Sequence, residues 1–196
     1  MRILIVGATG TIGSAVARAL SSRHEVLLAG NARGDFRVDL ADPQSIRALF
    51  QAAGIVDAVV SAAGKARFKP FADLEDEDFG FSLGHKLMGQ ANLVRFGLSH
   101  VADGGSFTLT SGILARHPSP GSAAISMVNS GLEGFVRAAA LEAPRNIRVN
   151  VVSPPWVSET LKAMGRDPSA GKPADAVAEA YVRAVEGRDT GKTFDA

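Results

Sequence analysis

The sequence predicts a single α/β domain, doubly wound around a parallel sheet. Short apolar runs alternate with segments of helical periodicity from one end of the chain to the other. Its 196 residues are enough for one domain with a full core and too few for two ordinary domains. Apolar strands that alternate with helices indicate parallel strands covered on both faces. We therefore expect residues 1–196 to form one domain without linkers or internal repeats.

The predicted strands are apolar runs too short to be helices. In chain order they lie at residues 2–6, 25–29, 56–61, 106–110 and 147–152, with a short last strand at 192–194.

The predicted helices are placed by their periodicity and by their first turns. Asp42 and Pro43 supply an N-cap and a proline at the first helical position of one helix. The acidic stretch 73–78 suits the positive end of a long helix that runs to about residue 98. The other helices are expected at residues 12–20, 122–143 and 173–186.

Composition excludes several classes of protein. The formal net charge is +1 and no basic arm or arginine cluster is present, so nothing points to nucleic-acid binding. The absence of Cys excludes disulfides and thiolate metal sites, and no other metal site is expected. No apolar run approaches the roughly 18 residues of a membrane span, and the amino terminus does not have the pattern of a signal peptide. We expect a cytoplasmic protein without a membrane partner.

A glycine-rich turn follows the first strand directly, at Gly7-Ala8-Thr9-Gly10-Thr11-Ile12-Gly13. Glycines allow a tight turn, a close approach of the backbone to a pyrophosphate, and contact between helix and strand. The phosphates then meet the free N–H groups of the helix. The alternative is a turn that serves packing alone, but the position between a strand and a helix favours a dinucleotide. The candidate cofactor-binding residues here are Gly7, Thr9, Gly10, Thr11, Ile12 and Gly13.

The choice between NAD(H) and NADP(H) depends on the end of the second strand, where a carboxylate would hold the adenosine ribose. Here Asn31 and Arg33 follow the strand, and no carboxylate occurs before Asp35. Arg33, with Asn31, is placed to meet a 2′-phosphate, although a loop arginine can also be simply solvated. The sequence therefore favours NADP(H), and NAD(H) stays possible.

Four further motifs resemble those of the short-chain dehydrogenase/reductase family, and the resemblance covers nearly the whole chain. They are Val38-Asp39-Leu40, Ser61-Ala62-Ala63-Gly64, the stretch 104–111, and the stretch 145–154. The resemblance implies a Rossmann-type fold in which Asp39 and Leu40 meet the adenine. Asp39 as a helix cap is the alternative, but Asp42 already fills that role. The resemblance also places Ala62, Ala63 and Gly64 along the cofactor, with Pro154 and Val157 near the nicotinamide.

The same resemblance fixes the register of the active site and shows where this chain departs from the family. The family's catalytic Tyr and Lys, four residues apart on one helix, fall on Ile125 and Asn129. The only tyrosine, Tyr181, lies in the last helix, so no shift of the alignment supplies the Tyr. The family's catalytic Ser falls on Ser111, and its relay Asn falls on Lys86. The chain resembles a divergent subgroup that keeps the glycine motif and loses most of the active site.

A few side chains remain as candidates for chemistry. Lys86 is expected either to be buried with a lowered pKa, or to be a solvated helix lysine. His85 lies about 100° around the same helix, so only one of the two is expected to point inward. His117 is a substitute acid or an exposed loop residue. Trp156 is expected to cover the nicotinamide or to cap a substrate pocket, or else to pack at a core edge or subunit contact.

Two functions remain open. The first is an NADP(H)-dependent oxidoreductase for a small carbonyl or alcohol, with Ser111 and Lys86 as catalytic residues. The second is a weak or inactive NADP(H)-binding sensor or partner subunit, because fold does not decide function. A homodimer or homotetramer is expected, since the helices near residues 76–98 and 122–143 carry more apolar residues than we expect one sheet face to cover. These residues are Leu87, Leu93, Val94, Phe96, Leu98, Val128, Leu132, Phe135 and Val136.

Overall fold

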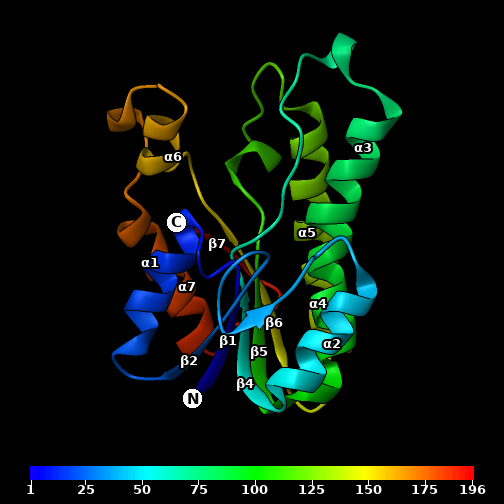
Figure 1. Cartoon of the computed structure of the whole chain (residues 1–196), viewed down its shortest axis with the longest axis vertical. Helices are drawn as coiled ribbons and strands as arrows, with labels where there is room; N and C mark the ends of the chain where they lie inside the picture. Colours follow the sequence, from blue (N-terminus) through cyan, green and yellow to red (C-terminus); the bar gives the residue numbers. More distant parts are fainter.

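A computed structural model describes all residues 1–196 and shows a seven-stranded parallel sheet with helices on both faces (Figure 1). The strand order is β3-β2-β1-β4-β5-β6-β7, and every neighbouring pair is parallel. The chain thus moves outward from β1 through β2 to β3, and then returns to add β4 to β7 on the other side. The predicted doubly wound α/β fold is confirmed.

The strands agree with the apolar runs of the sequence to within a few residues. They are β1 (Arg2–Val6), β2 (Glu25–Gly30), β3 (Phe36–Arg37), β4 (Val56–Ser61), β5 (Val101–Thr110), β6 (Arg148–Ser153) and β7 (Thr193–Asp195). β3 is only two residues long, which is too short to leave an apolar pattern.

The helices are α1 (Thr11–Ser21), α2 (Pro43–Ala53), α3 (Asp76–Ser82), α4 (Gly89–Gly97), α5 (Ala123–Glu142), α6 (Ser158–Ala163) and α7 (Ala174–Glu186). Asp42 caps α2 as predicted, because its carboxylate accepts a hydrogen bond from the Gln44 N–H at 2.8 Å.

The long helix predicted near residues 76–98 is interrupted. A π-helical turn, Leu83–Met88, joins α3 to α4. The acidic stretch also divides, because Phe71–Asp73 forms a separate 3₁₀ turn and Glu75 caps α3. The short helix α6 was not predicted. A π turn inserts an extra residue into the helix, and such turns are frequent at functional sites.

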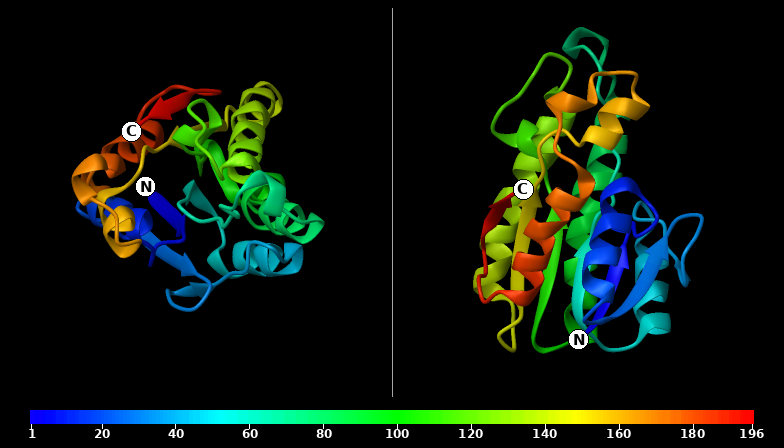
Figure 2. Two further views of the ribbon diagram at one scale, coloured as in Figure 1. Left: turned by 90° about the horizontal axis from the view of Figure 1, so that it is seen from above. Right: turned by 90° about the vertical axis from the view of Figure 1, so that its left-hand side faces the viewer.

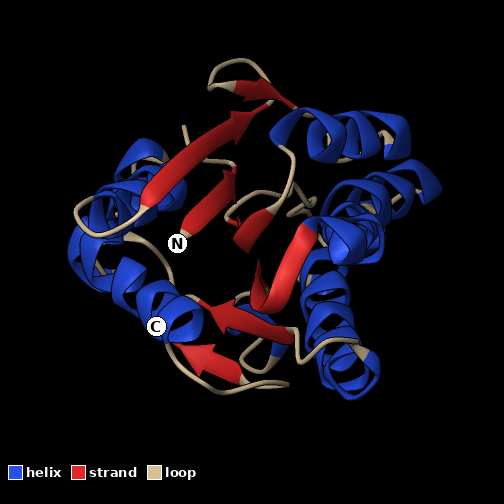
Figure 3. Cartoon of the chain, turned by 90° about the horizontal axis from the view of Figure 1, so that it is seen from below, coloured by secondary structure: helices blue, strands red, loops and turns tan.

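The two faces of the sheet are covered by different helices (Figures 2 and 3). The alternation of β1 shows the division: Ile3 and Ile5 belong to the core under α1 and α7. Leu4 and Val6 belong to the core on the opposite face, with residues of α2, α4 and α5. All four side chains are essentially inaccessible to solvent. This explains why the strand is a continuous apolar run and not an alternating one.

The turn after β1 depends on close contact between backbones. A Cβ built on Gly13 would lie 2.0 Å from the carbonyl oxygen of Gly7, so the first turn of α1 rests directly on the strand end. Gly7 itself has φ +83° and would place a Cβ 2.7 Å from the carbonyl oxygen of Ala62, at the end of β4. β1 and β4 lie on either side of the point where the strand order reverses, which is where ligands bind in open α/β sheets.

We predict that Gly13→Ala lowers the free energy of unfolding by about 2–3 kcal/mol, because backbone has to move to admit the methyl group. Gly80→Ala is the matched control: it is also helical, and a Cβ there meets nothing within 4 Å. It should raise the free energy of unfolding by about 0.5–1 kcal/mol. Chemical denaturation of the three proteins measures both changes. Equal stabilities for the two variants would contradict the contact between helix and strand.

Candidate cofactor and active site

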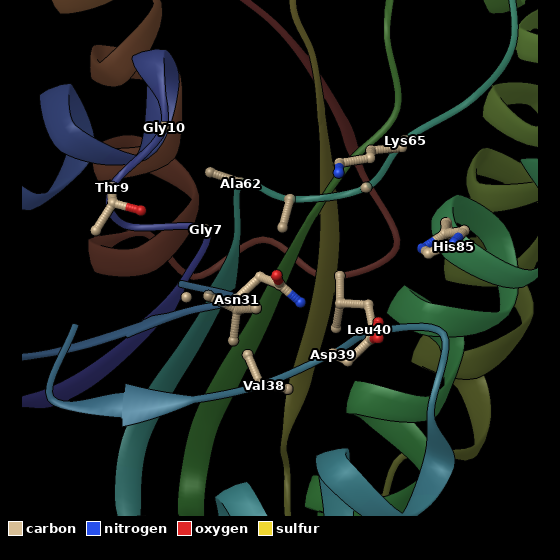
Figure 4. Close-up of a pocket in the computed structure, with 14 residues that line it drawn as sticks. Gly7, Thr9, Gly10, Asn31, Val38, Asp39, Leu40, Ala62, Lys65 and His85 are labelled. Atoms are coloured by element: carbon tan, nitrogen blue, oxygen red, sulfur yellow. The ribbon is translucent and has the colours of Figure 1, made fainter. Parts of the chain in front are cut away.

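A cavity of about 490 Å³ lies at the carboxyl ends of β1, β2 and β4 (Figure 4). Its walls come from the glycine turn, the end of β2, the loop after β3 and the loop after β4. The sequence-predicted residues that line it are Gly7, Thr9, Gly10, Asn31, Asp39, Leu40, Ala62, Ala63 and Gly64. Val6, Gly30, Val38, Lys65 and His85 complete the lining.

The glycine turn faces this cavity with the start of a helix behind it. Gly10 is the N-cap of α1, and no side chain caps the helix there. Thr11, Ile12 and Gly13 form the first helical turn and do not themselves line the cavity. The uncapped N–H groups and the positive end of the helix dipole are suited to an anionic group such as a phosphate. The residues present therefore fit the phosphates of a dinucleotide.

The loop after β2 leaves no carboxylate in the cavity. The carboxylate of Asp35 is turned back and accepts a hydrogen bond from the Leu28 N–H of β2 at 2.9 Å. Asn31 lines the cavity, and its carbonyl oxygen lies 3.5 Å from an Arg37 guanidinium nitrogen. Arg33 is exposed, forms no ion pair and does not line the cavity. The side chain of Arg33 is therefore not already in place to contact a 2′-phosphate in the cavity.

Asp39 and Leu40 lie where the sequence places them, on the wall beside α4. The Asp39 N–H is held by the Ser45 hydroxyl at 2.9 Å, and its carboxylate accepts from the Ala41 N–H at 2.9 Å. Asp42, and not Asp39, caps α2. The carboxylate of Asp39 is therefore fixed beside the cavity and is not used by the helix.

Lys86 is buried, which decides between the two expectations for it. The residue is 9% exposed, and its Nζ donates to the carbonyl oxygen of Ser111 at 3.1 Å. Its stem packs against Gly64, where a Cβ would lie 3.1 Å from the Lys86 Cγ and where φ is +130°. An ammonium has three donors, and Ser111 supplies the one protein acceptor. Burial lowers the pKa of Lys86 to about 8.

His85 lines the cavity and Lys86 does not, so only one of these two neighbours faces it. The His85 ring lines the cavity beside Lys65 (Figure 4) and lies 4.3 Å from the Phe81 ring, centroid to centroid. His85 and Lys86 both lie within the π turn Leu83–Met88.

Ser111 is buried at the end of β5, but its hydroxyl is turned into the protein. The hydroxyl donates to the Glu133 carboxylate at 3.1 Å and lies 3.4 Å from the Val152 carbonyl oxygen. The sequence reasoning expected this hydroxyl to face a substrate; instead the carbonyl of Ser111 meets Lys86. Glu133, a 7% exposed acid on α5, was missed. Its place on the buried face of α5, one residue after Leu132, was the signal that could have found it.

The residues at positions 125 and 129 carry no ionisable group. Asn129 is 1% exposed and lies next to Gly112, and its side-chain oxygen has no hydrogen-bond partner. Ile125 is half-buried on the same helix. Tyr181 is fully buried, and its hydroxyl pairs with the Thr110 hydroxyl at 2.7 Å. Burial raises the pKa of Tyr181 far above its usual value, so this tyrosine stays protonated.

None of the remaining candidates lines the cavity, and neither do Lys86 and Ser111. His117 is exposed, as the simpler reading of a loop histidine expected. Trp156 is half-buried and packs edge-on against Phe68, with ring centroids 6.1 Å apart. The Pro154 carbonyl accepts from the Ile113 N–H at 2.9 Å, and Val157 is buried in the core under α1 and α7. Neither residue lines the cavity.

Comparison with protein families agrees with the fold described above. A family model described as enoyl-(acyl carrier protein) reductase matches residues 7–193. The chain belongs to the short-chain dehydrogenase/reductase family. None of its helices combines the length and hydropathy that crossing a bilayer requires.

Curated relatives in this family are reductases and dehydrogenases. Hydroxynaphthalene reductase arp2 of Aspergillus fumigatus is 30% identical over 130 residues, which are 64% of this chain and 48% of that enzyme. The chain thus spans about half the length of that relative. Cis-4-hydroxycyclohexanecarboxylate dehydrogenase of Sinomonas cyclohexanicum is 29% identical over 210 residues, covering 94% of this chain and 82% of the enzyme.

Solved structures agree more closely. The protein lin1944 from Listeria innocua has a TM-score of 0.96 at 40% identity, covering 100% of this chain and 98% of that one. A small-chain dehydrogenase in complex with NADPH has a TM-score of 0.88 at 26% identity, covering 100% of this chain and 96% of that one.

We predict that Lys86→Met stabilises the protein in a pH-dependent way. The pKa of Lys86 is about 8 in the folded protein and near 10.5 when the chain is unfolded. Between these values the unfolded chain binds more protons, so the free energy of unfolding of the wild type rises with pH. Below pH 8 the buried charge costs roughly 3 kcal/mol, and above 10.5 the cost vanishes. The advantage of Lys86→Met in denaturation curves should therefore shrink between pH 8 and 10.5. Parallel stability profiles would contradict a buried lysine.

Proposed function

We propose that this chain is a cytoplasmic NADP(H)-dependent oxidoreductase that reduces a small carbonyl compound, or oxidises the matching alcohol. The observation that carries the proposal is the cavity at the carboxyl ends of β1, β2 and β4. The uncapped start of α1 faces this cavity, and the loop after β2 places no carboxylate in it. The family membership and the names of the relatives support a redox reaction.

In this proposal the cofactor is held from three sides. Gly7, Thr9 and Gly10, with Thr11, Ile12 and Gly13 behind them, receive the phosphates at the start of α1. Asp39 and Leu40 lie along the adenine, and Ala62, Ala63 and Gly64 follow the cofactor toward β4. Asn31 and Arg33 meet the 2′-phosphate, for which Arg33 swings in from its exposed position. Pro154 and Val157 stay in this proposal as supports of the nicotinamide end, because they anchor the segment after β6.

The proposed proton donor is Lys86. A bound nicotinamide supplies the hydride that goes to the carbonyl carbon. The Lys86 ammonium gives its proton to the carbonyl oxygen and becomes a neutral amine, which water then protonates again. A pKa of about 8 lets the amine change its protonation state near neutral pH. Ser111 contributes through its carbonyl oxygen, which orients Nζ. Reduction should therefore slow as the pH rises through about 8, and turnover that survives Lys86→Met would exclude this role.

A sensor or partner subunit that binds NADP(H) without turnover is the second candidate. Ile125 and Asn129 favour it, because neither can donate a proton or carry a charge where the family resemblance places the Tyr and Lys. Lys86 argues against it, because burying an amine destabilises the folded protein, and a functional role for Lys86 would explain why it is buried.

We predict that NADPH binds more tightly than NADH. No carboxylate from the loop after β2 enters the cavity to bind the ribose hydroxyls of NADH or to repel a 2′-phosphate. Calorimetric titration with both cofactors measures the difference. Arg33→Ala should weaken NADPH about tenfold or more and leave NADH nearly unchanged, since one charge-assisted contact is worth about 1.5–3 kcal/mol. Arg23→Ala, an exposed arginine paired with Glu186 outside the cavity, is the control. Absence of binding by either cofactor would refute the proposed function, and a preference for NADH would refute the Arg33 contact alone.

We also propose a homodimer, on grounds that differ from the sequence argument. Leu93, Val94, Val128, Leu132 and Val136 are buried in the chain's own core, so the number of apolar residues does not by itself require a partner. The support is instead an apolar groove of about 390 Å³ between α4 and α5. It is lined by Val94, Arg95, Leu98, Phe135, Ala138, Ala139, Glu142 and Ala143.

Light scattering at micromolar concentration should give twice the chain mass of 20.3 kDa. Ala138→Arg, on the exposed part of the groove, should convert the dimer to a monomer, because it places an unpaired charge in the interface. Ala52→Arg, at an exposed position on α2, should remain dimeric. A wild type that is only monomeric would refute the dimer.

A further inference from the structure

Glu133 is a buried acid that the proposed reaction does not use. It lies on α5 between Leu132 and Gly134, on the face that packs against the sheet, and its side chain is 9% exposed. Burying a carboxylate is costly unless it is paired and hydrogen-bonded. Packing alone would be served by an apolar side chain, so the partners of this carboxylate indicate what it does.

The first partner is the Ser111 hydroxyl, which donates to Glu133 Oε1 at 3.1 Å. The second is Arg116, whose Nε lies 3.7 Å from the same oxygen. Arg116 is in turn paired with Asp195 at the end of β7, and this pairing raises the pKa of Arg116 and lowers that of Asp195. Glu133 therefore joins the start and the end of the turn 111–116 that follows β5.

This turn carries the only protein acceptor of Lys86. On one side it is tied to β6 and the residue after it, because the Ser111 N–H donates to Val152 and the Ile113 N–H donates to Pro154, both at 2.9 Å. On the other side the turn is linked to α5 by the Ser111–Glu133 bond and the Arg116–Glu133 pair. The Ser130 hydroxyl of α5 also donates to the Ala115 carbonyl oxygen, at 3.2 Å. The Ser111 carbonyl, held between these attachments, accepts from the Lys86 Nζ. Of the links to α5, the Ser111–Glu133 bond is the one made by the residue whose carbonyl meets Lys86.

We propose that Glu133 is a positioning residue, which through the Ser111 hydroxyl and together with Arg116 holds the Ser111 carbonyl against the Lys86 amine. This inference rests on the proposed function of Lys86 as the proton donor. Glu133 acts through Ser111, because no hydrogen bond or ion pair joins it to Lys86 directly. A displacement of about 1 Å in a supporting residue can cost about a hundredfold in rate, so the attachment matters for turnover even though no reacting group touches it.

Two substitutions separate the hydrogen bond from the charge. Glu133→Gln keeps an oxygen that accepts from the Ser111 hydroxyl and removes the charge. Glu133→Met has a side chain of similar length that also excludes water, but it offers no comparable hydrogen-bond acceptor. Glu133→Met should lower kcat for NADPH-dependent reduction of a reactive ortho-quinone about tenfold or more, with the Kd of NADPH unchanged. Glu133→Gln should stay within about threefold of wild type. Glu179→Met, at an exposed position on α7 outside the cavity and the groove, is the matched control and should behave as wild type.

A second measurement does not require turnover. The pKa of Lys86 is followed by NMR of its labelled Nζ during a pH titration. In Glu133→Met it should fall below the wild-type value, because the charged amine loses its acceptor, whereas in Glu133→Gln it should not. Ser111→Ala breaks the same hydrogen bond while the carboxylate remains, so it should reproduce the fall even where Glu133→Met fails to fold.

An unchanged or raised Lys86 pKa in Ser111→Ala, or equal losses of kcat in the Gln and Met variants, would overturn the proposal. If the wild type reduces no quinone, the proposed function fails while the titration still decides the role of Glu133.

Discussion

The contact between the turn after β1 and its neighbours is the constraint on which the rest of the site depends. Gly13 rests on the Gly7 carbonyl, and Gly7 rests on the Ala62 carbonyl, so three backbones meet without side chains between them. This brings the start of α1 and the end of β4 to the point where the strand order reverses. The cavity is the space left beside this contact, and its depth is set by the absence of side chains. Any Cβ there would push the helix away from the cavity, where we propose that it binds the phosphates of the cofactor.

Much of the fold could be predicted because strands that are buried on both faces of a sheet are continuous apolar runs in the sequence. β1 is apolar at every buried position, and Asp42 with Pro43 marks a helix start by chemistry that is local to two residues. β3 and α6 left no such signal, because two residues and six residues are too few to show a period. The π turn at Leu83–Met88 was invisible for another reason. An extra residue in a helix is accommodated by tertiary packing. The side chains of this segment are compatible with a regular α-helix as well as with a π turn, so the sequence does not distinguish the two.

The candidate site divides along the same line. Glycine positions, Asp39 and the Ala62-Ala63-Gly64 stretch follow from backbone geometry, and these residues do line the cavity. The directions of side chains do not follow from sequence spacing. Ser111 is at the expected strand end, but its hydroxyl turns toward Glu133, an acid on α5 whose two partners, Ser111 and Arg116, both lie in the turn after β5. Arg33 lies in an exposed loop where no hydrogen bond or ion pair fixes its side chain, so nothing local to the sequence sets its direction.

The site holds one buried amine, and its surroundings explain why a second is absent. Lys86 fills the space beside Gly64 and reaches the Ser111 carbonyl, and Asn129 lies next to Gly112, one residue further along the same turn. A lysine at position 129 would bring a second ammonium to this short segment, where burial already lowers the pKa of the first. A neutral amide avoids that repulsion, at the cost of a side-chain oxygen without a partner. The π turn and the neutral residue on α5 are therefore linked. The turn presents Lys86 to Ser111, and Asn129 keeps the segment free of a competing charge.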